Sequence, residues 1–453
     1  MRSIDTFIAL NRFGLGAAPG EGDRVASDPR GWADAQVGRV PMPEALMRFR
    51  SSADIIADMH RARKQGPTTL RPAVREALRR DFGPEVMARA RHHIATDRPF
   101  AERLVLFWSN HFTVSRAKGI IGAAVPAFER EVIRPHVFGR FTDMLRAATR
   151  HPAMIAYLDN QVSIGERSRV GRRRMERKGN AKTLNENLAR EILELHTLGV
   201  NGGYAQRDVM ELARAITGWS HGGMRFGRDA RPIHGEFEFQ PNFHEPGPKT
   251  VLGITYREDG AEEGLAILDD LAHHPSTADF IATKLVRHFV ADDPPAGAVR
   301  AVARTFLETD GDLAAVSRAL VRLDAAWANP LAKVKSHYEF VIAVNRATGN
   351  AKAKRPNIMR PLRELGQQPF MAPSPAGWGD TAATWIAPEA LMRRIEWVRR
   401  YAATLPPTLR PDALLEETVG AVADDSLRRW VDLAPSGDAG IAMVLASPVF
   451  QRR

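Results

Sequence analysis

Two glutamates of this chain lie one helical turn apart, a spacing that suits acid–base chemistry. Glu191 and Glu194 follow Asn187 at intervals of four and three residues, which places the three side chains on one line of a helix. A pair of carboxylates can share the roles of general base and general acid, or hold a divalent metal ion between them. We therefore expect Glu191 and Glu194 to be catalytic residues, with Asn187 and the neighbouring Arg190 binding substrate.

The same segment has the apolar spacing of an amphipathic helix. Its stripe of hydrophobic residues consists of Leu184, Leu188, Ile192 and Leu195, and glycines at positions 199, 202 and 203 end the pattern. A second helix is expected from about residue 205, with a buried face made of Val209, Leu212, Ala213 and Ile216. Arg190 lies one turn before Glu194, where an ion pair forms easily. The competing interpretation is therefore a solvated helix face held by Glu–Arg pairs.

Histidines, lysines and a tryptophan outside this segment are further candidates. His111 ends an expected helix over residues 100–115, beside aromatic residues, and either His111 or His244 would act as the acid. Cationic groups would neutralise charge on the substrate, and an exposed aromatic ring could stack on a sugar. The binding candidates here are His244, Lys249, Lys333, Lys335 and Trp378. Each has a structural alternative: a hydrogen-bonded histidine, a solvated lysine, or a tryptophan that fills a gap between helices.

The composition limits the class of protein. The chain has 453 residues, of which 44% are hydrophobic, so it can bury a sizeable core. It has no apolar run of about 18 residues, which predicts no membrane span. It has no cysteine, which excludes disulfides, thiolate nucleophiles and cysteine-bound metals. Its first residues do not have the pattern of a signal peptide, so we expect a cytoplasmic protein, or an exported one if a further segment precedes them.

The net charge of +11 is due mostly to arginine, and many arginines lie in one segment. Residues 165–182 carry six arginines and two lysines, interrupted by glycine, which we interpret as a flexible basic loop. Such a loop could hold a phosphate or a polyanion, or it could be a solvated surface segment.

Helical periodicity dominates the chain on both sides of one short interruption. Residues 234–239 alternate in polarity and residues 250–256 are β-branched, and we expect His244 and Lys249 on the loop between them. The sequence therefore predicts a mainly α fold: one large multi-helix domain over residues 1–453, with a small β-hairpin excursion at 231–256. Subdomains would span residues 1–230 and 257–453.

Several short blocks, taken in order, are those of one known family. They are Asn11–Gly14, Phe107–Thr113, Tyr157–Asn160, Asn185–Gly199, Gly203-Tyr204, Thr217–Trp219, Gly247–Lys249, Gly377-Trp378 and Ser447–Phe450. In these blocks the chain resembles, over almost its whole length, the bacterial family catalogued as domain of unknown function 1800. The resemblance implies no activity. It does imply a partner, because many members look exported and are encoded beside a second uncharacterised family, 1501, which is similar to alkaline phosphatases and sulfatases.

Three hypotheses follow from the sequence. The first is a hydrolase or group transferase that uses its glutamate carboxylates, with or without a divalent metal ion, on an anionic or glycan substrate. The second is a non-catalytic binding or scaffold protein with the polar helix face as its interface. The third, ranked last because the chain has no known nucleic-acid-binding module, is nucleic-acid binding through the arginine-rich segment.

Overall fold

Helices make up nearly all of the regular structure, as the apolar spacing of the sequence predicts. The computed structural model describes residues 3–117, 119–178, 184–222, 234–350 and 358–453. Within these ranges the strands form two sheets of two strands each. The prediction of a mainly α fold with a small β excursion is confirmed. No helix in the described ranges is long and apolar enough to cross a membrane.

The first part of the chain is a series of short helices, several of which contain a π-helical turn. Its elements are α1 (Ile4–Ile8), η1 (Ala9–Phe13), α2 (Glu21–Val25), α3 (Pro29–Asp34), α4 (Glu44–Met47), α5 (Ser52–Lys64), α6 (Pro67–Ala77), η2 (Leu78–Phe82), α7 (Gly83–Ala95) and α8 (Pro99–His111). They continue with η3 (Gly119–Ala124), α9 (Val125–Phe128), η4 (Glu129–Ile133), α10 (Arg134–His136), α11 (Phe141–Arg150), α12 (Pro152–Tyr157), η5 (Asn160–Val162), α13 (Arg169–Lys178), α14 (Asn187–Glu191), η6 (Ile192–His196) and α15 (Gln206–Ala215).

The strands follow, and then a second run of helices. The strands and the turn between them are β1 (Trp219–His221), β2 (Phe237–Phe239), η7 (Pro241–Phe243), β3 (Lys249–Val251) and β4 (Ile254–Tyr256). The helices are α16 (Ala261–His273), α17 (Pro275–Phe289), α18 (Ala296–Glu308), α19 (Leu313–Arg322), α20 (Ala325–Ala328), α21 (His337–Ala347), α22 (Met359–Glu364), α23 (Ala382–Trp385), α24 (Pro388–Ala402), α25 (Pro411–Thr418), α26 (Asp425–Asp432) and α27 (Gly437–Ala446).

The β excursion contains one hairpin and one strand that pairs outside the expected range. β3 and β4 are antiparallel, and Leu252 and Gly253 between them both have positive φ, the conformation of a tight two-residue turn. β2 pairs instead with β1, so that Trp219 lies opposite Phe239. The sequence did not predict β1, which is only three residues long.

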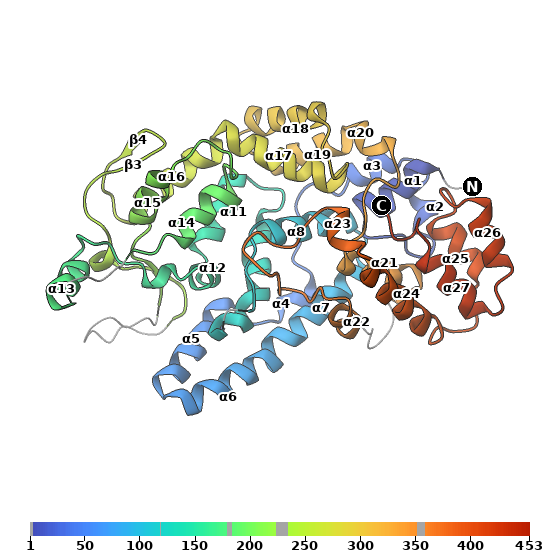
Figure 1. The fold of residues 1–453 in the computed structure, drawn as a ribbon, viewed down its shortest axis with the longest axis horizontal. Helices are drawn as coiled ribbons and strands as arrows, with labels where there is room; N and C mark the ends of the chain where they lie inside the picture. Colours follow the sequence, from blue (N-terminus) through green and yellow to red (C-terminus); the bar gives the residue numbers. More distant parts are fainter. Residues whose placement is uncertain (1–2, 118, 179–183, 223–233, 351–357) are drawn as a thin grey trace.

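The helices are arranged around α8 and α21, which lie near the middle of an elongated molecule (Figure 1). α16 to α19 line one long edge, and α24 to α27 form the end nearest the N-terminus. Buried hydrophobic residues from Phe7 to Phe450 form one connected core. The beginning of the chain is part of this core, since the ring of Phe13 stacks on Phe289 and Trp327 with centroid distances of 5.7 and 4.9 Å.

Helix α13 occupies a segment where the sequence indicated a loop. The interpretation of residues 165–182 as a flexible loop is wrong for Arg169–Lys178, which are helical. Arginine, methionine, glutamate and lysine are all good helix formers, and the Ser168 hydroxyl caps the first turn by accepting a hydrogen bond from the amide of Gly171 at 3.0 Å. Residues 179–183, the rest of the expected loop, lie outside the described residues.

A cluster of buried charges joins three of the central helices. Glu129 accepts hydrogen bonds from Arg89 at 2.6 Å and from Arg134 at 3.3 Å. Arg134 also binds Glu102 through both of its terminal nitrogens, at 2.8 Å each, and His93 contacts the same carboxylate at 3.0 Å. Burial by itself would raise the pKa of Glu129, but Arg89 and Arg134 outweigh it and hold that pKa at about 2. Both carboxylates therefore remain ionised inside the protein.

Arg134→Met tests this cluster. The substitution leaves Glu102 buried without its arginine, and loss of one partner of a buried ion pair typically costs about 3–5 kcal/mol. We expect the free energy of unfolding in urea to fall by that amount. Arg79→Met is the matched control, because Arg79 pairs with Glu76 on the surface with 77% of its side chain exposed; it should change stability by less than about 1 kcal/mol. Equal losses in the two variants would contradict this account.

A buried pair of histidines predicts how stability depends on pH. His60 Nε2 lies 3.1 Å from His221 Nδ1, and burial, reinforced by Arg63 and Lys64, lowers the pKa of His60 from 6.5 to about 4. In the unfolded chain His60 therefore binds a proton below pH 6.5, whereas in the folded protein it binds this proton only near pH 4. Stability is complete above that pH and falls as the pH drops toward 4, by on the order of 3 kcal/mol for this group. Urea unfolding should show a shallower acid-side slope in His60→Gln, but an unchanged slope in the control His273→Gln, whose side chain is exposed.

Candidate functional site

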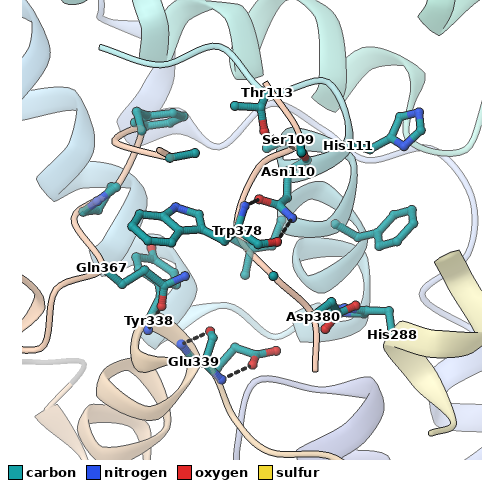
Figure 2. Close-up of a pocket in the computed structure, with 18 of the residues that line it drawn as sticks. Ser109, Asn110, His111, Thr113, His288, Tyr338, Glu339, Gln367, Trp378 and Asp380 are labelled. Atoms are coloured by element: carbon teal, nitrogen blue, oxygen red, sulfur yellow. Dashed lines mark hydrogen bonds and ion pairs between the residues drawn. The ribbon is translucent and has the colours of Figure 1, made fainter. Parts of the chain in front are cut away.

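A pocket of about 390 Å³ lies between the C-terminal end of α8, one face of α17, the start of α21 and the loop of residues 367–381. Figure 2 shows Ser109, Asn110 and His111 on one side of it and Trp378 and Asp380 on the loop that crosses it. Aromatic side chains form much of the wall: Phe107, Tyr338, Phe370, Trp378 and Trp385. Mostly apolar walls with a few polar groups are typical of small-molecule sites.

The loop is fixed to α8 by a pair of hydrogen bonds. The Asn110 side chain accepts from the amide of Trp378 at 2.8 Å and donates to the carbonyl of the same residue at 2.9 Å (Figure 2). Gly377 has φ of +81°, and a Cβ there would lie 2.6 Å from the carbonyl oxygen of Asn110. Only glycine allows the loop to approach the helix this closely, which places the indole of Trp378 in the pocket wall.

Three cationic or titratable residues of α17 line the pocket. Lys284, Arg287 and His288 are spaced i, i+3 and i+4, so they share one face of the helix. The opposite face, which includes Ala278, Ala282 and Val286, is buried in the core. This triplet was not among the residues singled out from the sequence. The available signal was three basic residues on one face of an otherwise apolar helix.

His288 and Asp380 form a hydrogen-bonded dyad. His288 Nδ1 lies 2.8 Å from a carboxylate oxygen of Asp380, and His288 Nε2 is buried and has no hydrogen-bond partner among the described residues. Burial lowers the pKa of His288, with Asp380 acting in the opposite direction, so the ring is neutral at pH 7. Because a carboxylate only accepts, Nδ1 carries the proton and Nε2 has a free lone pair, as in a histidine that acts as a general base.

Lys284 meets His111 in a contact whose polarity can be assigned. His111 Nε2 lies 3.1 Å from the carbonyl oxygen of His196, which can only accept, so Nε2 carries the ring proton. His111 Nδ1 therefore accepts from the Lys284 ammonium at 3.0 Å. Burial, together with Lys284 and His196, keeps the pKa of His111 well below its usual value, and burial lowers the pKa of Lys284 to about 8. His111 thus lines the pocket as a neutral acceptor.

The floor of the pocket is continuous with the buried charge cluster. The Ser109 hydroxyl donates to Glu129 at 2.8 Å, and Arg89 donates to the Tyr338 hydroxyl at 3.1 Å. The Tyr338 hydroxyl also lies 2.8 Å from His93 Nδ1. Ser109 and Tyr338 are therefore oriented from below by groups that are themselves fixed by ion pairs.

The central segment folds as predicted in part, and Arg190 has a different partner. The expected helix is present as α14, but it widens into the π-helical turn η6 at Ile192. This turn lies between Arg190 and Glu194 and changes their relative direction. Arg190 forms the Glu–Arg pair of the competing interpretation with Glu186, at 3.0 Å, and not with Glu194; it also binds Gln206 at 2.9 Å. The second expected helix is α15, and its predicted buried face is confirmed.

Glu191 and Glu194 lie on the half-buried side of α14 and η6 and do not line the pocket. Burial, followed by the neighbouring charge of Glu194, raises the pKa of Glu191. Glu194 contacts the Tyr204 hydroxyl, and Asn187, at the start of α14, is exposed. The catalytic role of the glutamate pair stays a prediction at a place separate from the pocket.

The remaining candidates are distributed over three places. His111 and Trp378 line the pocket. Lys333 lies behind it, donating to the backbone carbonyl of Asp380 at 2.6 Å. Lys335 is buried and donates to the carbonyls of Phe450 and Arg452 at 2.7 and 2.8 Å, where it holds the C-terminal residues.

His244 and Lys249 lie together near the β excursion, away from the pocket. The expectation that both are on a loop is wrong for Lys249, which belongs to β3 and is 1% exposed. Its ammonium binds Glu263 at 2.8 Å and lies 3.5 Å from His244 Nε2. A buried lysine needs such a partner, and this explains why it points inward. His244 also borders a second, open pocket beside α13.

Metal ligation was left open by the sequence. In the part of the chain that the structure describes, no group of three or more histidine, aspartate or glutamate side chains converges in a way that could hold a metal ion.

Comparison with known proteins gives one match. The sequence profile of the family described as "Protein of unknown function (DUF1800)" matches residues 8–452, so the chain belongs to this family. No curated protein and no solved structure matches the chain significantly.

Gly377→Ala tests the contact that closes the pocket. The new methyl group would collide with the Asn110 carbonyl and side chain, in addition to the backbone strain at positive φ. Gly366→Ala is a matched control, because Gly366 has φ of +86° but open space around its Cβ position. We expect the control to lose about 1 kcal/mol of stability and Gly377→Ala at least twice as much, with altered tryptophan fluorescence from a displaced Trp378. Equal losses would mean that the loop does not depend on this approach.

Proposed function

We propose that this member of the DUF1800 family is a hydrolase or group transferase that acts on a small anionic or glycan substrate in the pocket between α8, α17 and the 367–381 loop. The observation that carries the proposal is the His288–Asp380 dyad, in which His288 lines the pocket and its buried Nε2 has no hydrogen-bond partner among the described residues. A neutral histidine held by a carboxylate is the usual device for removing a proton from water or from an acceptor hydroxyl.

Each group around the dyad has a role in this reaction. His288 Nε2 takes the proton from the attacking water or hydroxyl, and Asp380 stabilises the imidazolium that forms. Lys284 and Arg287 lie on the same face of α17 as His288. They attract the negative charge of the substrate and of the transition state. The indole of Trp378 and the ring of Phe107 offer apolar faces for a sugar or another ring.

The glutamate pair is a second candidate for the base, within the same class of reaction. The raised pKa of Glu191 beside Glu194 is what one carboxylate of an acid–base pair requires. A divalent metal ion would belong to this version of the mechanism. The two versions place the base on different elements, α17 and α14, so substitutions can separate them.

The partner and the location remain proposals drawn from the sequence. A protein of the phosphatase- and sulfatase-like family 1501 would be the partner, as the family resemblance implies. The location would be cytoplasmic, or outside the cell if the protein is exported with such a partner.

The test is a screen of chromogenic substrates followed by three variants. The purified chain is assayed against 4-nitrophenyl phosphates, sulfates, carboxylate esters and glycosides, with and without Mg²⁺. For any substrate that is turned over, we expect His288→Asn to lower kcat/KM by about 10²–10⁴, the typical contribution of a general base. Glu191→Gln should have little effect, and the exposed control His273→Asn should have none.

The opposite result for the two variants would place the active site outside the pocket. If Glu191→Gln abolishes turnover and His288→Asn does not, the base is in the central segment and the pocket is not the active site. If no substrate is turned over while a partner binds stoichiometrically, the second hypothesis, a binding or scaffold protein, replaces the enzyme.

A further inference from the structure

Lys284, which is partly buried, differs in its partners from the three buried lysines among the described residues. Lys249 and Lys333 form ion pairs with Glu263 and Asp292, and Lys335 binds two backbone carbonyls. Lys284 forms no ion pair with a described residue, and its hydrogen bond is to His111 Nδ1, a neutral imidazole nitrogen. Its amine therefore lines the pocket without a carboxylate in ion-pair contact among the described residues.

The surroundings of this amine are apolar or cationic at close range. The ring of Phe280 lies 5.4 Å from Nζ, and Phe280 itself is packed against Gly199, where a Cβ would approach the ring to 2.7 Å. The charged and titratable groups that face Lys284 are His111 from α8, His196 from η6, Arg287 and His288 from α17, and Asp380 from the loop. Burial outweighs the opposing effect of Asp380 and lowers the pKa of Lys284 to about 8.

We propose that Lys284 is a nucleophilic amine that forms an imine with a small oxo acid in this pocket, with Arg287 binding the acid's carboxylate. The proposal rests on the proposed function, because it uses the same pocket. It names small oxo acids as the substrate class of a group transferase. Arg287 is three residues from Lys284 on the same helix face, and among the described residues its guanidinium donates only to the backbone carbonyl of Asp292, at 3.2 Å. With this i, i+3 spacing, the carboxylate of the oxo acid can bind Arg287 while its carbonyl carbon lies beside the amine of Lys284.

The chemical step is balanced without an oxidant or a reductant. The lone pair of the neutral amine forms a bond to the carbonyl carbon, and the π pair moves to oxygen, which takes up a proton. That oxygen takes up a second proton and leaves as water, the nitrogen gives up both of its protons, and a carbon–nitrogen double bond forms. The hydrogen bond to His111 Nδ1 uses one N–H of the amine and so leaves its lone pair directed elsewhere. His288, one turn along α17, is the nearest group of the dyad for moving protons in the dehydration step.

Reductive trapping tests the proposal on the intact protein. The chain is incubated at pH 7 with sodium pyruvate and cyanoborohydride, and labelled lysines are located by peptide mass mapping. A lysine with a pKa of about 8 has roughly 10²-fold more free amine at this pH than one at 10.5. We expect Lys284 to be labelled at least tenfold faster than the exposed Lys64. Label distributed over the surface lysines with no excess at Lys284 would overturn the proposal.

Two variants and a second carbonyl compound refine the result. Lys284→Arg must lose the label at this peptide, which confirms the assignment. Arg287→Met should slow trapping of pyruvate by tenfold or more and leave trapping of acetone, the uncharged analogue, unchanged. Equal slowing of both would refute Arg287 as the carboxylate site. Trapping requires no turnover, so its failure would leave the role of His288 in hydrolysis intact.

Discussion

The pocket depends on two carboxylates that are buried in the middle of the fold. Glu102 and Glu129 are each about 2% exposed, and an ionised carboxylate at such a position is tolerated only when it is paired and hydrogen-bonded. Arg134 binds both, and Arg89 completes the pairing of Glu129. Because these residues come from α7, α8, η4 and α10, the requirement for pairing fixes these helices relative to one another. Tyr338 connects α21 to the same cluster through Arg89 and His93. These hydrogen bonds fix the position of the Tyr338 side chain in the floor of the pocket.

Three asparagines in the blocks that identify the family, Asn110, Asn160 and Asn185, hold backbone segments. Asn110 fixes the loop of Trp378, and Asn160 donates to the carbonyls of Ile216 and Trp219 at 3.1 and 3.0 Å. Asn185 binds the carbonyl of Asp159 and, through its side-chain oxygen, the amide of Asn187. The central segment thus supports the pocket indirectly. Its contribution is the His196 carbonyl, which fixes the tautomer of His111, and Gly199, which makes room for the ring beneath Lys284.

Local pattern was sufficient to predict the mainly helical fold and the strands after residue 234, because burial follows apolar spacing of 3.6 and 2 residues, but it missed α13 and β1. It identified His111 and Trp378 because each is in a short block of unusual composition. It could not find the dyad, since His288 and Asp380 are 92 residues apart in sequence and are joined only by the fold of the intervening loop. Nor could it predict the π-helical turn at Ile192, which shifts the buried stripe, so that Leu193 is buried while the expected Leu195 is only partly buried.

The balance of charges around the pocket favours an anionic ligand. Its carboxylates are already neutralised: Glu129 by two arginines, Glu339 by Arg103 and Arg453, and Asp380 by Lys333 and Arg453. Neither Lys284 nor Arg287 forms an ion pair with a carboxylate among the described residues, although the charge of Asp380 acts on Lys284. A cation removed from water without a counter-charge destabilises the fold, and such a residue is better replaced by an apolar one unless it has a use. Cations without an ion-pair partner, in a fold that elsewhere pairs its buried charges, indicate a binding or catalytic site.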